Sequence, residues 1–164
     1  MQNLVLKSST GLLLAISLYA SAYCQTTITP SPSATPASGG SPVQLFPSAE
    51  VTTSFLQGGT LAQGSNYKVM TALRTKGGNV EVHRKFTDVF YVVEGKATIV
   101  VGGRVLGESA SDADEPRGTS IEGGESRQLL PGDVIVIPAG IPHWINAVEG
   151  SFRYFVVKVQ TPEP

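Results

Sequence analysis

The sequence predicts an all-β domain, a sandwich or barrel of short strands, over residues 43–160. Beyond residue 42 the core-forming residues are mostly valine, isoleucine, phenylalanine and tyrosine, which favour pleated strands. Runs of these residues recur at close intervals, separated by turn sequences that contain glycine or proline, and none of the runs has a helical period. Many short strands at this spacing are typical of antiparallel sandwiches and barrels.

Each run is expected to form one strand. In chain order the runs cover residues 51–56, 67–75, 80–84, 89–93, 96–101, 126–130, 134–137, 143–147 and 152–159. Glu94-Gly95 and Glu149-Gly150 are two of the intervening turn sequences. The stretch 104–125 is polar, so we expect it to be an exposed excursion between two strands.

The charge of the chain excludes one class of partner. Its 164 residues include 12 lysines and arginines against 13 aspartates and glutamates, so there is no basic surplus to neutralise phosphates. Nucleic acid is therefore not an expected partner.

The N-terminus has the layout of a secretory signal peptide, in which a lysine precedes an apolar run over residues 11–20 and small residues follow. The run is too short for a membrane span. Cleavage can follow Ala22 or Cys24, and we favour Cys24, which assigns residues 1–24 to the signal. A lipid anchor on Cys24 is the alternative, which the bulky Tyr23 before it disfavours. We therefore expect an exported protein, periplasmic or secreted.

Residues 25–42 predict a flexible linker, because they are rich in serine, threonine and proline and hold almost no large apolar side chain. Removal of the signal through Cys24 would leave no cysteine, so no disulfide is expected to stabilise the mature protein. The linker is followed by the single domain at residues 43–160.

Two segments, 78–103 and 131–146, contain the most informative spacings. In the second segment, a glycine is followed at fixed intervals by proline, glycine and histidine, namely Gly132, Pro138, Gly140 and His143. In the first segment, six residues of mostly β-branched and aromatic type separate Asp88 from Gly95. The two segments resemble the conserved motifs of the cupin superfamily. The resemblance implies a cupin-type double-stranded β-helix, or jelly-roll barrel, over nearly the whole domain.

The first segment departs from the cupin pattern, which has His-x-His before the acidic residue, because only His83 is present. If the pattern is aligned on Asp88, His83 takes the second histidine position and Glu81 the first. If it is aligned on Gly77, His83 takes the first position and Lys85 the second. We favour Glu81, because a carboxylate binds metal and a protonated lysine does not.

The resemblance also implies a metal site inside the barrel, with His83, Asp88 and His143 as ligands and Glu81 as a fourth. Independently of the family, two imidazoles and a carboxylate suit Fe(II), Mn(II) or Zn(II) and leave positions open for water or substrate. The chain has only two histidines, and they stand at corresponding points of two strand segments. We therefore expect a divalent metal ion as cofactor.

Strand alternation predicts the remaining surroundings of this site. The residues expected to form its apolar wall are Phe90, Val92 and Ile145, with Tyr154 at the rim. Tyr91 and Trp144 are expected to face outward, where they would suit a homodimer interface.

Cupins carry many activities on one barrel, so the fold does not fix the function. We expect a metal-dependent enzyme acting on a small organic molecule, in which the ion polarises an oxygen or activates water or dioxygen. The alternative is a non-enzymatic cupin that binds or senses a small ligand through a degenerate metal site. A scaffold for association is the third interpretation. No motif in the sequence identifies the substrate or a catalytic residue.

Overall fold

The computed structural model describes residues 42–109 and 113–161, so the expected signal peptide and all but the last residue of the expected linker lie outside it. These described residues belong to one unit of the chain, Gly39–Pro164. Their elements are α1 (Ser48–Ser54), β1 (Gly59–Gln63), β2 (Tyr67–Arg74), β3 (Val80–Glu81), β4 (Phe86–Val101), β5 (Arg104–Leu106), β6 (Arg117–Gly118), β7 (Ser120–Glu122), β8 (Glu125–Leu129), β9 (Val134–Ile137) and β10 (His143–Gln160).

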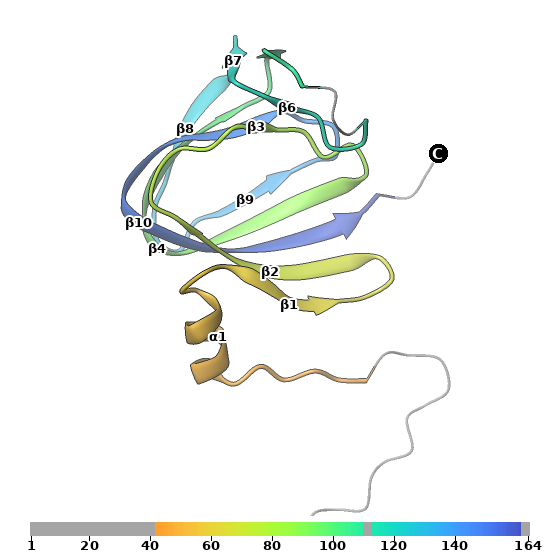
Figure 1. Cartoon of the computed structure of the whole chain (residues 1–164), viewed down its shortest axis with the longest axis vertical. Coiled ribbons are helices and arrows are strands. Elements are labelled where there is room, and N and C mark those ends of the chain that lie inside the picture. The colour runs from red at the N-terminus through yellow and green to blue at the C-terminus, as the bar shows by residue number, and fades with distance from the viewer. Residues whose placement is uncertain (1–41, 110–112, 162–164) are drawn as a thin grey trace, which may run out of the picture. The chain divides into compact units, whose positions relative to one another are not determined.

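The long strands β4 and β10 pair with each other and bend from one layer of the fold into the other (Figure 1). In the first layer, the second half of β10 lies between β2 and β4, with β1 beyond β2 and β9 beyond β4. In the second layer, the first half of β10 lies between β3 and β4, with β6 beyond β3 and β8 beyond β4. Two antiparallel layers that share bent strands make a jelly roll, which confirms the predicted fold class.

β4 and β10 continue through Glu94-Gly95 and Glu149-Gly150, where the sequence predicted turns between separate strands. The two glycines have φ angles of +83° and +71°, and the pairing of β4 with β10 shifts register beside them. Because bulges of this kind bend a strand without ending it, the predicted turns are corners of the jelly roll instead.

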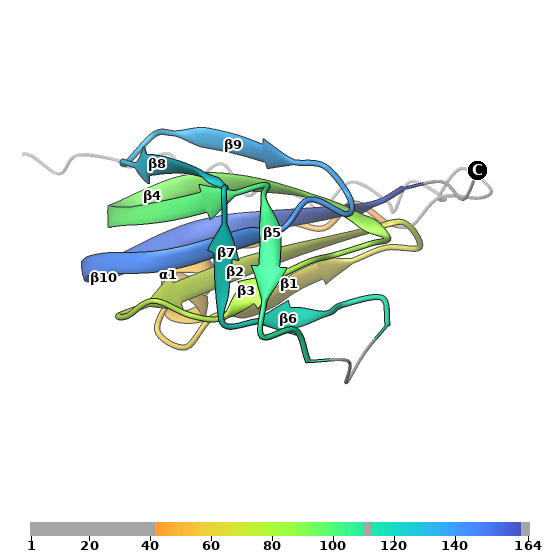
Figure 2. The ribbon, with the colours of Figure 1, turned by 90° about the horizontal axis from the view of Figure 1, so that it is seen from above.

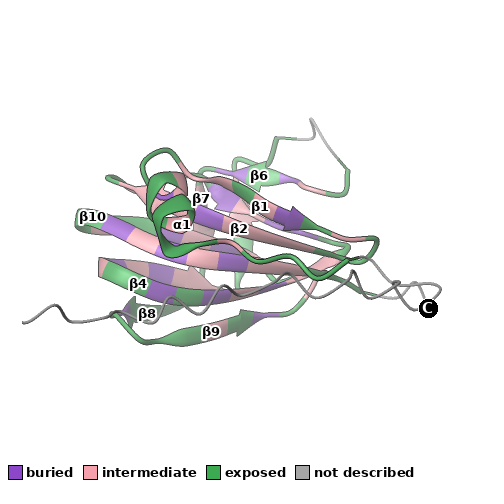
Figure 3. Cartoon of the chain, turned by 90° about the horizontal axis from the view of Figure 1, so that it is seen from below, coloured by how far each residue is buried: buried purple, intermediate pink, exposed green. Residues whose placement is uncertain are grey.

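The strand predicted at residues 51–56 is wrong, because helix α1 covers most of it. The hydroxyls of Thr52 and Thr53 donate to backbone carbonyls one turn earlier in the chain. None of the helical residues is buried (Figure 3). The chain is held to the barrel by the next residue, Phe55, whose ring packs edge-on against Phe155 with 5.0 Å between the ring centroids. The strand preference of the valine and threonines is outweighed by this anchoring contact.

The stretch 104–125 is not a simple exposed excursion. β5 and β7 form a two-stranded ribbon that runs across the direction of the long strands (Figure 2), and β6 pairs with β3. Backbone amides of Val82 and Arg84 donate to the carbonyls of Pro116 and Asp114. This stretch therefore extends the second layer along one edge, where hydrogen bonds to β3 and its extension compensate for its low hydrophobicity.

Tyr91 and Trp144, the two aromatic side chains expected to face outward, differ in their exposure to solvent. Tyr91 is 48% exposed, as predicted. Trp144 is only partly exposed, and its indole N–H donates to the carbonyl of Gly78 at 2.6 Å. Trp144 therefore secures the loop before β3, which leaves less of its ring for an interface.

In the described residues, no helix has the length and apolar character needed to cross a membrane.

The corner at Gly95 gives a test of this architecture. An alanine there would need a strained positive φ, and its Cβ would also clash with the carbonyl oxygen of Ser151. Gly132 has a φ of +92° but open space around a Cβ, so it isolates the strain alone. We expect Gly132→Ala to lower the free energy of unfolding by about 1–2 kcal/mol, and Gly95→Ala by about 2 kcal/mol more. If urea denaturation showed the same loss of unfolding free energy in both variants, Gly95 would not be a crowded corner between β4 and β10.

Candidate metal centre

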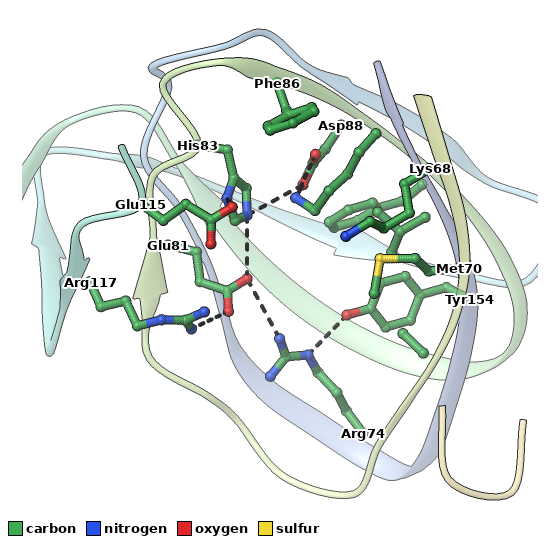
Figure 4. A pocket seen from close by; sticks show the side chains of 14 residues that line it. Lys68, Met70, Arg74, Glu81, His83, Phe86, Asp88, Glu115, Arg117 and Tyr154 are labelled. Carbon is green, nitrogen blue, oxygen red and sulfur yellow. Dashed lines mark hydrogen bonds and ion pairs between the residues drawn. The ribbon is translucent and has the colours of Figure 1, made fainter. Parts of the chain in front are cut away.

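A cavity of about 340 Å³ lies between the two layers at one end of the barrel (Figure 4). Five strands or their extensions contribute to its lining, and the lining mixes ionisable and apolar side chains. The ionisable residues are Lys68, Arg74, Glu81, His83, Asp88, Glu115, Arg117, Tyr154 and Lys158, and the others are Met70, Ala72, Phe86, Phe90 and Val156.

His143, the first residue of β10, is 3% exposed beside this cavity. Its Nδ1 lies 3.2 Å from the carbonyl oxygen of Ile141, and because a carbonyl only accepts, Nδ1 carries the proton. Burial lowers the pKa of the imidazole, which keeps it neutral and leaves a lone pair on Nε2. That Nε2 has no hydrogen-bond partner in the described part of the chain, and it lies 3.9 Å from Asp88 Oδ2 and 4.0 Å from Glu81 Oε2.

His83 follows β3 and is 6% exposed. Its Nε2 lies 3.6 Å from Asp88 Oδ2 and 3.8 Å from Glu81 Oε2, so it faces the same two carboxylates as His143. Its other nitrogen, Nδ1, lies 3.4 Å from Oε1 of Glu115. The two imidazole rings are 5.3 Å apart between centroids. The predicted convergence of the two histidines is therefore present.

Glu81 lies directly opposite His143 in the pairing of β3 with β10. Arg117 donates to Oε1 at 2.5 Å, whereas Oε2 faces both imidazoles. Burial alone would raise the pKa of this carboxyl, but the contacts with His83, Arg117 and Arg74 outweigh it and hold the pKa well below its usual range. Glu81 is thus ionised and presents one oxygen to the histidines.

Asp88 is 2% exposed, and both of its oxygens accept hydrogen bonds from Nζ of Lys158, at 2.8 and 2.9 Å. Lys158 stands directly across from Asp88 in the pairing of β4 with β10. This ammonium already compensates the buried carboxylate, so Asp88 is less available to a metal than the sequence suggested.

The residues fit a divalent cation. Glu81, His83 and His143 each offer one ligand atom, and these atoms lie within 4.8 Å of one another. Bonds of about 2.1 Å would bring ligand atoms to about 3.0–3.4 Å apart, so closure needs movements of less than about 1 Å. Lone pairs that face a carboxylate are stabilised by a cation between them. Lys85, the other candidate for the missing histidine position, places its ammonium 2.8 Å from Asp114 instead.

The apolar wall differs in part from the prediction. Phe90 and Tyr154 line the cavity, with ring centroids 5.0 Å apart. Val92 and Ile145 point inward as expected from strand alternation, but they are not among the residues that line the cavity and belong to the hydrophobic core. Inward-facing positions farther along β4 and β10 fill the closed end of the barrel, because side chains from both layers meet there.

Several residues of the site were missed by the sequence analysis. Lys158 could have been found, because it continues the inward alternation of Tyr154 and Val156 along β10. Glu115 and Arg117 belong to the polar stretch that was interpreted as an excursion, and no periodicity marks them. Arg74 ends β2 and donates through Nε to the Tyr154 hydroxyl at 2.9 Å.

Comparisons with known proteins agree with this fold. The family model described as Cupin matches residues 57–164. The BH2720 protein of Bacillus halodurans, a solved structure, is similar over 75% of this chain and 86% of its own, at 18% identity and a TM-score of 0.51. A cupin superfamily protein of Desulfitobacterium hafniense is similar over 63% and 75%, at 18% identity and 0.44. The DMSP lyase DddQ of Ruegeria pomeroyi is similar over 66% and 48%, at 16% identity and 0.46. No curated protein matches the sequence.

The low pKa of Glu81 makes the stability of the metal-free protein depend on pH. Its stabilising contribution is present above the ordinary value of 4.5 and is lost as the pH falls below it, because the unfolded chain binds the proton more tightly. With a chelator present, we expect Glu81→Gln to lose less free energy of unfolding than the wild type between about pH 5 and pH 3. Glu94→Gln, which removes an exposed carboxylate paired with Arg153, is the matched control for urea denaturation. If the unfolding free energy of Glu81→Gln fell with pH as steeply as that of the wild type, Glu81 would not be the ionised group responsible.

Proposed function

The chain belongs to the cupin family, and on that premise we propose that its barrel binds one divalent ion and works as a metal-dependent enzyme on a small organic molecule. The observation that carries the proposal is the unpartnered Nε2 of His143, which faces Glu81 and Asp88 beside His83. Iron, manganese and zinc are all compatible with this set of nitrogen and oxygen donors.

Glu81, His83 and His143 would hold the ion, with Asp88 beside them. A bound divalent ion supplies Lewis-acid chemistry, which polarises an oxygen of the substrate or lowers the pKa of a water. Glu115 would accept the proton of His83 Nδ1 and so fix the orientation of that ring, as outer partners of metal-bound histidines commonly do.

Tyr154 gives the cavity a group that can donate a proton or a hydrogen bond. Burial raises the pKa of its hydroxyl, although Arg74 partly opposes this effect. The hydroxyl accepts from Arg74, so its own hydrogen remains available to a bound molecule. Phe90 packs against its ring and gives that side of the cavity an apolar surface.

The sequence also predicts export, and this stays a prediction. The mass of the protein recovered from its native host would test it, since retention of residues 1–24 would contradict cleavage of a signal peptide.

Metal analysis tests the proposal directly. We expect the purified protein to hold about one equivalent of a divalent ion. We expect His83→Ala and His143→Ala to weaken metal affinity by more than the about 10- to 100-fold typical of outer-shell changes. Glu81→Gln should also weaken it, and Glu94→Gln, the same change outside the cavity, should not. If the wild type neither holds an ion nor binds iron, manganese or zinc in calorimetry, the proposal is wrong.

The alternative, a non-enzymatic cupin that binds or senses a small ligand, has one observation in its favour. Lys158 compensates Asp88, and Arg117 and Arg74 compensate Glu81, so both carboxylates have cationic partners from the chain itself. A site with internal cations of this kind tolerates the absence of a metal ion.

Lys158 tests whether the ion binds beside Asp88. If an ion binds beside Asp88, removal of the ammonium in Lys158→Gln should raise Mn(II) affinity about tenfold, because a neighbouring positive charge disfavours a second one. Lys96→Gln, which removes a lysine paired with Glu149 outside the cavity, should leave the affinity unchanged. An unchanged or reduced Mn(II) affinity in Lys158→Gln, with the fold retained in circular dichroism, would contradict binding of the ion beside Asp88.

A further inference from the structure

Two lysines stand directly opposite each other at the cavity. Lys68 of β2 pairs in register with Lys158 of β10, and both line the cavity. Cβ atoms at such positions are about 4.5–5.5 Å apart, and like charges placed there destabilise a sheet. The next strand places Asp88 opposite Lys158, so the row across three strands reads lysine, lysine, aspartate.

Asp88 compensates only one of these lysines. Both of its oxygens accept from Lys158, whereas no ion pair or hydrogen bond of the Lys68 ammonium is found among the described residues. Lys68 is nevertheless half-buried at the cavity wall. An ammonium that faces a cavity next to a second ammonium has an uncompensated charge, and an anion in the cavity would compensate it.

The charge of the whole lining leads to the same conclusion. Four cations line the cavity, Lys68, Arg74, Arg117 and Lys158, against three carboxylates, Glu81, Asp88 and Glu115. The histidines are left out of this count, since the neutral imidazole is the form that binds metal. The surplus is therefore one positive charge, the difference of four and three, and a divalent ion would increase it.

The lining beside Lys68 selects the remainder of the ligand. On β2 and β10, the neighbouring pair on the inward face is Met70 opposite Val156, and Phe90 of β4 follows Val156. An apolar row thus adjoins the charged row. The cavity volume of about 340 Å³ is at the lower end of the range for small-molecule sites.

We propose that this cavity binds a small organic carboxylate, whose charged group lies at Lys68 beside Lys158 and whose apolar part contacts Met70, Val156 and Phe90. The inference names the substrate class of the site proposed above and rests on that function for its catalytic meaning. A negative charge matches the sign of the surplus, and the apolar row favours an organic acid over an inorganic anion. Figure 4 shows the two sides of the cavity that such a molecule would bridge, with Glu81 and His83 on one side and Lys68 and Met70 on the other.

Binding of matched pairs of probes tests the inference. Benzoate and hexanoate are each compared with the corresponding amide, and inorganic phosphate is a separate arm. Saturation-transfer NMR and calorimetry are run on the purified protein, both with zinc and with chelator. We expect each carboxylate to bind about tenfold or more tightly than its amide. Lys68→Gln should abolish this preference and leave amide binding and metal content unchanged.

Lys76→Gln is the control, because it removes an exposed lysine beyond the end of β2. Equal affinity for carboxylate and amide in the wild type would overturn the inference, as would tighter binding of phosphate than of either carboxylate. Equal losses in Lys68→Gln and Lys76→Gln would also overturn it, since they would reflect overall charge. Carboxylate binding that depends on Lys68 in a protein that takes up no metal would support this inference while contradicting the proposed enzyme. Metal binding without a carboxylate preference would do the reverse.

Discussion

The pairing of β10 with both β3 and β4 is the constraint on which the site depends. It sets His143 opposite Glu81 in one layer and Lys158 opposite Asp88 in the other, so three ionisable side chains from distant parts of the chain line one cavity and His143 lies beside it. A slip of one residue in β10 would turn its inward side chains to the outer face, because successive residues of a strand alternate. The bends at Gly95 and Gly150 make the double pairing feasible, since they let the same two strands serve both layers.

Charge compensation is the second theme of the structure. Buried carboxylates are costly unless paired, and the chain supplies Lys158 for Asp88 and Arg117 for Glu81. His143 differs from the acids, because its Nε2 has no hydrogen-bond partner among the described residues. Cations from the chain thus hold the acids in place, while the unpartnered nitrogen of His143 is left for a metal ion. Because the acids have cationic partners and the His143 nitrogen does not, a metal ion and an organic carboxylate can be proposed for neighbouring parts of the site.

The sequence was a good guide where short-range spacing decides the structure. The recurring short runs predicted an all-β domain and the alternation along β4 predicted its inward side chains, because turn residues and period-two patterns are local signals. The jelly roll itself was implied by the resemblance of the two motifs to those of cupins. The sequence failed as a guide where long-range contacts decide. Phe55 anchors a helix against Phe155 in a segment with strand propensity, and Glu115 reaches the cavity from a polar stretch whose described residues pair beside β3. The partnership of Lys158 with Asp88 joins residues far apart in the chain, so no local pattern contains it.

We propose that two imidazoles share one ion inside the barrel. Pulsed electron paramagnetic resonance of the protein loaded with one equivalent of Mn(II) examines this most directly, because electron spin echo modulation detects directly bound imidazole nitrogen. We expect modulation from two imidazole nitrogens, with one lost in His83→Ala and one in His143→Ala. A bound Mn(II) whose spectrum shows only water and carboxylate oxygen would contradict it.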